Sequence, residues 1–314
     1  MTGKIALVFP GQGAQHVGMG RDLWEQVPEA RALLEESGRA LGIDLAALCF
    51  EGPEDRLTLT ANAQPAILAV SMAAFAAFRQ GGISFDYVAG HSLGETSALV
   101  AADSLRFDDA IRAVRKRGEF MQEAVAPGIG TMAAILGLQR EAVLEVCHEA
   151  AQGEVVEIAN FNGPDQIVVA GHAAAVERAV ALAKTRGARR AIRLQVSAPF
   201  HCSLMRPAGQ RLAPVLKAIP IADPKVPLVN NVDAEVVTKG TQIEEGLVRQ
   251  VSSPVRWTEV VQRLVKEGVS VFVELGPGRV LTGLIKRIAG EARALHAEDL
   301  ASLRTAVDQL KACS

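Results

Sequence analysis

The pentapeptide Gly90-His91-Ser92-Leu93-Gly94 is the strongest chemical signal in the sequence. It fits the G-x-S-x-G pattern of a nucleophile elbow, a sharp turn between a strand and a helix that exposes a serine hydroxyl. The apolar run Tyr87-Val88-Ala89 predicts the strand before it, and an alanine-rich segment predicts the helix after it. The short pattern also fits an ordinary glycine-bounded turn. The flanking elements favour a catalytic serine, which can form covalent acyl intermediates.

A serine nucleophile needs a general base, and His201 is the candidate. It ends the segment Ser197-Ala198-Pro199-Phe200-His201, directly after the last predicted strand of a small domain, where a side chain can reach an interdomain cleft. Spacing alone does not separate it strongly from His16 or His91, although His91 should point away if Ser92 points outward. No aspartate stands out to orient the imidazole. Gln250 is a neutral candidate that would act through a carbonyl group.

The loop Gly11-Gln12-Gly13 follows the first predicted strand and invites comparison with dinucleotide-binding loops. His16 replaces the third glycine of that motif, and no acidic residue closes a second strand at the required distance. We therefore interpret the loop as a turn that brings the Gln12 backbone N–H toward the elbow. Together with the Leu93 N–H it would form an oxyanion hole, in which one donor contributes about 3 kcal/mol. A plain tight turn is the alternative.

A helix predicted from Asp108 to Glu123 places Arg117 at the margin of its apolar face. At about 100° per residue, this face consists of Ala110, Ile111, Val114, Gly118 and Met121. Arg112 and Lys116 project from the opposite, solvated face. An unpaired guanidinium at the margin would be costly to bury, so Arg117 needs an anionic partner. Periodicity alone favours an internal Asp or Glu; the alternative is a substrate carboxylate bound bidentately.

Two kinds of strand and helix order divide the chain. Residues 1–128 and 198–314 alternate strands with helices, which predicts a large α/β domain with a parallel sheet covered on both faces. Residues 129–197 have the order strand, helix, strand, strand, helix, strand, the arrangement of a ferredoxin-like fold. The predicted elements of this small domain are Met132 to Leu136, Arg140 to Ala150, Val155 to Ala159, Ile167 to Ala170, Ala174 to Thr185 and Ala191 to Val196.

The composition narrows the class of protein. Apolar residues make up 49% of 314 residues, charged residues 22%, and the formal net charge is −2. This balance provides a sizeable core and excludes a generally basic protein that coats nucleic acid. The cysteines, Cys49, Cys147, Cys202 and Cys313, are widely spaced. Their spacing argues against a disulfide framework or a metal site and favours a reducing, cytoplasmic compartment.

Two apolar segments could be mistaken for targeting or membrane segments. Lys4 to Phe9 is a short run before glycines without a cleavage-site pattern, so we predict a first strand and not a signal peptide. Ala66 to Phe78 is too short to span a bilayer. We predict a buried helix there, with Pro65 in its first turn.

Five segments, in order along nearly the whole chain, resemble the malonyl-CoA:acyl carrier protein transacylase family. They are Phe9-Pro-Gly-Gln-Gly-Ala-Gln15, Gly90-His-Ser-Leu-Gly-Glu95, Arg117-Gly118 with Met121-Gln122, Ala198-Pro-Phe-His201 and Gly276-Pro-Gly-Arg-Val-Leu-Thr-Gly-Leu-Ile-Lys286. The combination is highly specific. The resemblance implies an α/β-hydrolase-like large domain with an inserted ferredoxin-like small domain. It also implies malonyl transfer from malonyl-CoA to the phosphopantetheine thiol of acyl carrier protein, without a cofactor or metal. A free-standing chain favours fatty acid biosynthesis, and we expect a monomer.

The same resemblance assigns roles to individual residues. Ser92 is then the nucleophile and His201 the base. Gln12 and Leu93 donate the oxyanion N–H groups, Arg117 binds the malonyl carboxylate, and Gln250 matches the residue whose carbonyl orients the histidine. One departure is Thr96, where many relatives carry an aromatic residue.

Acyl selectivity and carrier-protein docking follow from the resemblance as well. In related polyketide acyltransferases, phenylalanine before the histidine accompanies malonyl and serine accompanies methylmalonyl. Phe200 therefore favours malonyl, because a bulky ring would crowd an added methyl group. The carrier proteins are acidic, which predicts a basic docking surface. Its candidates are Arg189, Arg190 and Arg193 on the small domain and Lys286 and Arg287 on the large one. Solvated surface charge is the alternative for each.

Two other functions remain open from the sequence. A serine esterase or thioesterase would transfer the acyl group to water, and a non-catalytic module would only bind CoA or carrier protein. The missing aspartate in the usual Ser…Asp…His order and the position of Arg117 count against a hydrolase. The intact Ser92 and His201 count against a module without catalysis.

Overall fold

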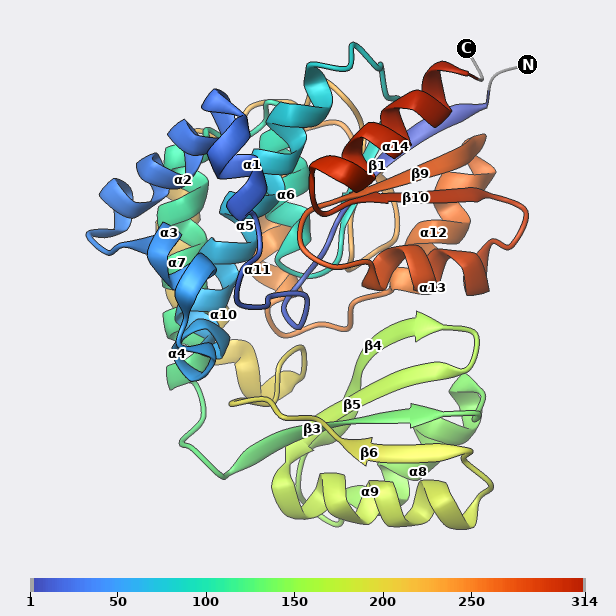
Figure 1. The fold of residues 1–314 in the computed structure, drawn as a ribbon. Helices are drawn as coiled ribbons and strands as arrows, with labels where there is room; N and C mark the ends of the chain where they lie inside the picture. Colours follow the sequence, from blue (N-terminus) through green and yellow to red (C-terminus); the bar gives the residue numbers. More distant parts are fainter. Residues whose placement is uncertain (1–2, 313–314) are drawn as a thin grey trace.

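The computed structural model describes residues 3–312, which form a large sheet flanked by helices and a small sheet below it (Figure 1). The larger sheet has the strand order β10-β9-β1-β2-β7-β8. Its strands are β1 (Lys4–Phe9), β2 (Tyr87–Gly90), β7 (Leu228–Val229), β8 (Val236–Val237), β9 (Val269–Leu275) and β10 (Arg293–Ala297). Neighbouring strands are parallel except β7 and β8, which are antiparallel. The predicted parallel sheet is therefore confirmed, with one short antiparallel strand at its edge.

Strand β1 is central because its apolar run is buried on both faces, as parallel strands between two helix layers require. Ala6 and Val8 pack in one core with helices α12 (Trp257–Lys266) and α13 (Val280–Ile288), whereas Leu7 and Phe9 pack in another with α5 (Thr60–Arg79). Phe9 pairs with Gly90 of the neighbouring β2. The loops that follow β1 and β2 therefore leave the same edge of the sheet side by side.

The helices outside the small sheet's unit cover both faces of the large sheet. They are α1 (Arg21–Gln26), α2 (Pro28–Leu41), α3 (Leu45–Glu51), α4 (Glu54–Thr58), α5 (Thr60–Arg79), α6 (Gly94–Ala101), α7 (Phe107–Glu123), α10 (Arg206–Lys217), α11 (Gly240–Gln250), α12 (Trp257–Lys266), α13 (Val280–Ile288) and α14 (Leu300–Lys311), with the short 3-10 helix η1 (Ser203–Met205).

Helix α5 corrects two predictions. It begins at Thr60, so Pro65 lies inside the helix and not in its first turn. The carbonyl of Ala61, left without a donor at Pro65, accepts a hydrogen bond from Arg115 Nη1 at 3.1 Å. At 20 residues the helix is long and apolar enough to cross a membrane, but 89% of its most apolar window is buried inside the protein. Its burial, and not its length, identifies it as a core helix.

The small sheet has the strand order β4-β5-β3-β6, with every neighbouring pair antiparallel. Its elements are β3 (Gly130–Leu136), α8 (Arg140–Ala151), β4 (Val156–Gly163), β5 (Gln166–His172), α9 (Ala173–Thr185) and β6 (Arg190–Arg193). The predicted ferredoxin-like order is confirmed. Strand β6 ends before the predicted Val196, because a tight Val196 N–H to Leu194 O hydrogen bond turns the chain back toward the large sheet.

The two sheets meet through β4 and the segment that leads into α12. Asn160 forms a bridge with Val255, and Thr258 Oγ1 donates to the Phe161 carbonyl at 3.0 Å. Arg140 of α8 pairs with Glu259 of α12 at 3.0 Å. These contacts hold the small sheet against the edge of the large sheet where the β1 and β2 loops emerge.

The cysteines Cys49, Cys147 and Cys202 are buried and free. Burial raises the pKa of each of these thiols to about 12. Cys313 lies outside the described residues.

Candidate active site

Ser92 lies in the turn between β2 and α6 with a φ of 53°, in the left-handed region that a non-glycine residue adopts only when the surroundings enforce it. A Cβ at Gly90 would lie 1.9 Å from the Gly94 main chain, and a Cβ at Gly94 would lie 2.0 Å from the Phe9 carbonyl oxygen. Both positions therefore require glycine. The strand–turn–helix geometry of a nucleophile elbow is present.

Asn231, which no motif marks in the sequence, holds this turn from the neighbouring strand's end. Its Oδ1 accepts from the Ser92 N–H at 2.7 Å, and its Nδ2 donates to the Gly90 carbonyl at 2.7 Å. Its own N–H donates to Glu95 Oε2 at 2.9 Å. The available signal was a polar pair, Asn230-Asn231, at the carboxyl end of a buried parallel strand, where α/β proteins place functional groups.

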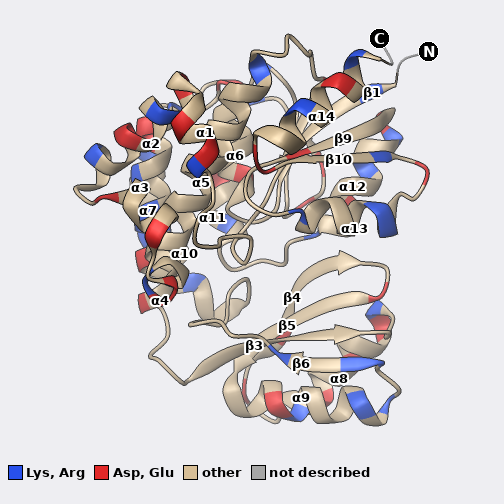
Figure 2. Cartoon of the chain, viewed as in Figure 1, with Lys and Arg blue, Asp and Glu red and all other residues tan. Residues whose placement is uncertain are grey.

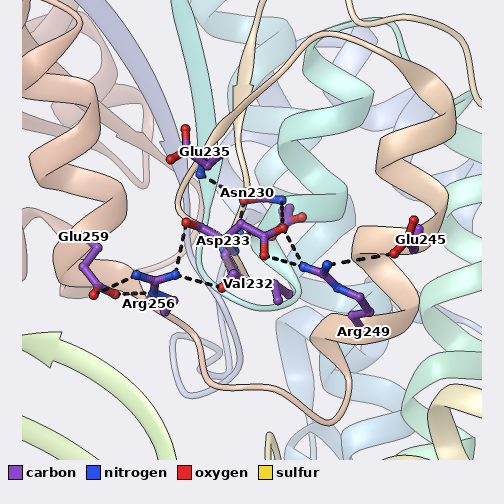
Figure 3. A network of polar contacts seen from close by, with 10 residues as sticks. Asn230, Val232, Asp233, Glu235, Glu245, Arg249, Arg256 and Glu259 are labelled. Atoms are coloured by element: carbon purple, nitrogen blue, oxygen red, sulfur yellow. Dashed lines mark hydrogen bonds and ion pairs between the residues drawn. The ribbon is translucent and has the colours of Figure 1, made fainter.

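The loop that carries Asn231 is fixed by a polar network, drawn in Figure 3. Asp233 accepts from Arg249 of α11 at 2.5 Å. Arg256 donates to the Asp233 carbonyl at 3.2 Å and pairs with Glu259 at 2.6 Å. The loop is thereby tied to α11 and α12 on either side.

His201 faces the serine hydroxyl. Its Nε2 lies 2.7 Å from Ser92 Oγ, and its Nδ1 lies 2.9 Å from the main-chain oxygen of Gln250. A carbonyl can only accept, so Nδ1 carries the proton and Nε2 is free to accept from the serine. Burial, with the nearby Arg117 charge, lowers the pKa of His201 from 6.5 to about 3. The imidazole is therefore neutral at pH 7.

Gln250 contacts the histidine with its main chain, which leaves its side chain for other partners. Its Oε1 accepts from Arg117 Nη2 at 2.8 Å. Its Nε2 donates to the Ser92 carbonyl at 3.1 Å and to Glu95 Oε2 at 2.9 Å. The carbonyl predicted to orient His201 is thus the backbone carbonyl.

Arg117 is 5% exposed and points from α7 to the serine. Its Nη1 donates to Gln64 Oε1 at 2.8 Å, and its Nη2 donates to Ser92 Oγ at 3.1 Å as well as to Gln250. No Asp or Glu among the described residues forms an ion pair with it, so the internal acidic partner favoured by periodicity is wrong. Neutral amide oxygens satisfy the guanidinium instead. Burial lowers the pKa of Arg117 to about 10, against the opposing charge of Glu95, and it stays charged at pH 7.

The backbone N–H groups of Gln12 and Leu93 have no hydrogen-bond acceptor within residues 3–312. Both residues line the cavity above Ser92. The Gln12 side chain is held by Thr60, its Nε2 donating to Thr60 Oγ1 at 3.1 Å. Two unpaired N–H groups beside a serine are what an oxyanion hole requires.

The other histidine candidates do not face Ser92 Oγ. His91 Nε2 lies 2.8 Å from Asn162 Oδ1 of β4, and its ring packs against Trp257. His16 contacts the Ala14 carbonyl. No group of three or more His, Cys, Asp or Glu that could hold a metal ion occurs between residues 3 and 312.

A cavity of about 730 Å³ opens above the serine, between the two sheets. The part of the chain around the large sheet contributes Gln12, Ser92, Arg117 and Phe200, and the small sheet contributes Met132, Asn160, Asn162 and Val168. Phe200 is 7% exposed. The volume falls within the range of small-molecule sites and leaves room for an extended substrate arm.

Gln64 and Glu95, like Asn231, are site residues to which the sequence assigned no role. Gln64 is 1% exposed among the mostly apolar buried residues of α5, where a buried amide needs a specific partner. Glu95 is 2% exposed and follows the elbow. A polar residue inside a strongly apolar helix was the available signal for Gln64.

Two of the predicted docking residues, Arg189 and Arg287, lie at the turn between β4 and β5. Arg189 Nη2 pairs with Asp165 at 2.7 Å, and Arg287 Nη2 donates to Gln166 Oε1 at 2.7 Å, so both contact the β4–β5 turn. Figure 2 shows basic residues on β6 and α13. Arg190 and Lys286 are exposed. Arg193 instead lines the cavity and donates to Thr131 Oγ1 at 3.1 Å.

A serine on a strained turn, a neutral histidine braced by a carbonyl and two unpaired N–H groups are the arrangement of nucleophilic acyl transfer. The model of the acyl transferase domain family matches residues 6–308, and the chain belongs to this family.

Its relatives extend over nearly the whole chain. A malonyl CoA-acyl carrier protein transacylase of Bacillus subtilis (strain 168) is 50% identical over 309 residues, covering 98% of each chain. The protein of that name from Escherichia coli (strain K12) is 47% identical over 306 residues, covering 97% of this chain and 99% of the relative. The resemblance predicted from the motifs is confirmed.

Solved structures agree with the fold. The transacylase of Coxiella burnetii superposes with a TM-score of 0.96 at 43% identity, covering 99% of this chain and 98% of the other. A malonyl-transacylase in complex with its type II PKS acyl-carrier protein gives 0.95 at 47% identity, covering 98% and 99%. The predicted fold, an α/β-hydrolase-like sheet with a ferredoxin-like insertion, is confirmed.

Proposed function

We propose that this chain transfers a malonyl group from malonyl-CoA to the phosphopantetheine thiol of an acyl carrier protein, by a ping-pong reaction through a malonyl ester on Ser92, and supplies fatty acid biosynthesis. The observation that carries the proposal is the position of Ser92 Oγ, 2.7 Å from His201 Nε2 and 3.1 Å from Arg117 Nη2. The nucleophilic oxygen therefore lies within hydrogen-bond distance of a general base and of a cation that can bind a carboxylate. The names of the relatives support the same reaction.

In the first half-reaction, His201 Nε2 takes the Ser92 proton as Oγ attacks the thioester carbonyl. The oxyanion lies between the N–H groups of Gln12 and Leu93. When the intermediate collapses, the carbon–sulfur bond breaks and the imidazolium returns the proton to the leaving CoA sulfur. The product is the malonyl ester of Ser92 and free CoA thiol.

The second half-reaction repeats these steps with the carrier protein's thiol as nucleophile. His201 takes the thiol proton, the sulfur attacks the ester carbonyl, and the ester bond to Ser92 Oγ breaks. The proton then returns to Ser92. The Gln250 carbonyl keeps the imidazole in the tautomer that both halves need.

Arg117 would bind the free malonyl carboxylate and disfavour acyl groups without one. In the unliganded site its charge opposes protonation of His201 and so weakens the base. A bound carboxylate compensates that charge, so malonyl would promote proton uptake by His201 whereas acetyl would not. Selectivity then arises in both binding and chemistry.

Phe200 would set the size limit at the acyl α-carbon, since its buried ring lines the cavity beside His201. We expect Phe200→Ser to raise the ratio of methylmalonyl to malonyl transfer by about tenfold, because the vacated volume accepts one methyl group. Competition between the two CoA esters measures the ratio. An unchanged ratio would assign selectivity to another wall of the cavity.

Intact-protein mass spectrometry after brief mixing with malonyl-CoA tests the reaction itself. Wild type should gain a malonyl-sized adduct that discharges onto holo carrier protein, and Ser92→Ala should gain none. An adduct lost to water at the same rate with or without carrier protein would indicate the hydrolase. A wild type that never forms an adduct would indicate a binding module.

For carrier-protein docking we propose the basic surface of Arg189, Arg190, Lys286 and Arg287. Arg190 and Lys286 are the better probes, because Arg189 and Arg287 also hold the β4–β5 turn. Charge reversal at both should raise the KM for carrier protein several-fold at low salt, with the effect fading as salt screens it. Arg39→Glu, an exposed residue of α2, is the control. Equal KM values would eliminate this surface.

We also propose residues 1–128 with 198–314 as the large domain and 129–197 as the small one. The protein would act as a cytoplasmic monomer without a cofactor or metal. Three free, buried cysteines support a reducing compartment. Light scattering at working concentrations tests the monomer, and a mass of two chains would overturn it.

A further inference from the structure

Glu95 is a buried carboxylate with no part in the proton transfers above. It lies in the first turn of α6, directly beneath the elbow, and is 2% exposed. Its Oε2 accepts from the Asn231 N–H and from Gln250 Nε2, each at 2.9 Å. A buried carboxylate is costly unless it is hydrogen-bonded and its charge compensated, so its retention under the nucleophile calls for a reason.

The Gln250 amide connects Glu95 to Arg117. An amide has a donating end and an accepting end, and the two are exchanged by a half-turn of the group. A carboxylate only accepts, so Glu95 holds the Nε2 end toward itself. The Oε1 end must then face Arg117, where it accepts from Nη2 at 2.8 Å. Without Glu95, only the Ser92 carbonyl, which accepts from Gln250 Nε2 at 3.1 Å, would oppose a half-turn of the amide that brings its NH2 group against the guanidinium.

The interposed amide also keeps the two charges from pairing directly. A bidentate ion pair would occupy the N–H groups that a substrate carboxylate needs. In this arrangement Arg117 donates three of its N–H groups to Gln64, Gln250 and Ser92. Its remaining N–H groups have no acceptor within residues 3–312 and can bind a substrate carboxylate. Burial raises the pKa of Glu95 to about 7, and in its ionised form Glu95 offsets the buried positive charge and opposes the lowering of the Arg117 pKa.

We infer that Glu95 is a positioning residue for carboxylate recognition: through the Gln250 amide it orients the Arg117 guanidinium and balances its charge without occupying its donors. This inference rests on the proposed function, because it assumes that Arg117 binds the acyl carboxylate. Glu95 would thereby help to select the acyl group, in addition to accepting the hydrogen bond from the Asn231 N–H that supports the turn.

The test is the ratio of malonyl-CoA to acetyl-CoA acylation, as kcat/KM, because a general loss of structure lowers both and leaves the ratio unchanged. Glu95→Ala should lower the ratio about tenfold or more, through loss of the malonyl reaction. Glu95→Gln keeps an oxygen that can accept from Gln250 Nε2 but loses the negative charge and gains an NH2 group, so its ratio should lie between those of Glu95→Ala and wild type. Glu274→Gln is the control, since Glu274 is also fully buried but caps α13 through Leu281 and Thr282.

Gln250→Leu is the alternative variant for the same measurement if Glu95→Ala does not fold. It removes the amide but keeps the main-chain carbonyl that holds His201, and should lower the ratio as Glu95→Ala does. A wild-type ratio in whichever of these two variants folds overturns the inference. Its failure is distinguishable from failure of the proposed function: if wild type forms a malonyl-serine but the ratio does not move, only the role of Glu95 is lost. If wild type forms no malonyl-serine, the proposed function itself falls.

Discussion

Replacing Arg117 with alanine separates recognition of a carboxylate from the acyl-transfer chemistry. The guanidinium is 5% exposed, and the cavity provides the space in which a malonyl carboxylate can reach it. A hydrogen bond to a charged group contributes about 1.5–3 kcal/mol. Losing two of them should cost about 3–6 kcal/mol, which is about 10²- to 10⁴-fold in kcat/KM for malonyl-CoA.

Acetyl-CoA provides the comparison, because it lacks the carboxylate. Arg117 also lies 3.1 Å from Ser92 Oγ, and its charge lowers the pKa of His201. Its removal takes a donor from the nucleophile but makes the histidine a better base, so the two effects oppose each other. We expect the acetyl reaction to change less than about tenfold. The malonyl-to-acetyl ratio should therefore fall by at least about tenfold, and by more if the opposing effects cancel.

Single-turnover acylation, followed by quenching and mass spectrometry, measures both rates on the same samples. Arg112→Ala is the matched control, since Arg112 lies on the solvated face of the same helix with its side chain 51% exposed. Arg117→Lys keeps the charge but loses the planar fork of donors. Its malonyl-to-acetyl ratio should therefore lie between those of Arg117→Ala and Arg112→Ala. An Arg117→Ala variant with the wild-type malonyl-to-acetyl ratio would refute the assignment.

Three further predictions concern the base and the elbow. His201 acts when neutral, so the rate at which a neutral fluorophosphonate labels Ser92 should stay flat from pH 8 to about pH 5 and fall only at lower pH; a midpoint near the ordinary value of 6.5 would contradict the lowered pKa. Asn231→Ala leaves two buried backbone groups without partners and should lower the free energy of unfolding by about 2–4 kcal/mol in urea titrations; an unchanged midpoint would mean that the elbow holds itself. Gly94→Ala should prevent the elbow from forming, because its Cβ would lie 2.0 Å from main-chain oxygen, whereas Gly283→Ala in α13 has no atom within 4 Å and should fold normally; soluble expression and circular dichroism compare the two, and equal folding would show that the elbow can relax.

The sequence predicted what local sterics and periodicity determine. The elbow follows from two glycines that no side chain could replace, between an apolar strand and a helix. The burial of Arg117 follows from its place on the helical face of α7. The ferredoxin-like order follows from the alternation of short apolar runs and amphipathic helices, each of which is a local pattern.

Long-range contacts account for the predictions that were wrong or open. The partners of Arg117 are Gln64 and Gln250, which come from α5 and α11, and no pattern in α7 indicates them. His91 and His201 could not be separated by spacing, because their ring directions depend on contacts with β4 and α11. Helix α5 could begin before Pro65 because Arg115, from α7, satisfies the carbonyl that proline leaves without a donor.

The most direct test of the central claim uses the isolated malonyl-enzyme. It is prepared with excess malonyl-CoA, freed of nucleotide by rapid gel filtration, and mixed with carrier protein that either carries or lacks phosphopantetheine. We predict that the malonyl group moves quantitatively to the holo carrier protein within the time of mixing, and that it stays on Ser92 when only the apo form is present. Equal release as free malonate in both mixtures would contradict acyl transfer to a carrier thiol.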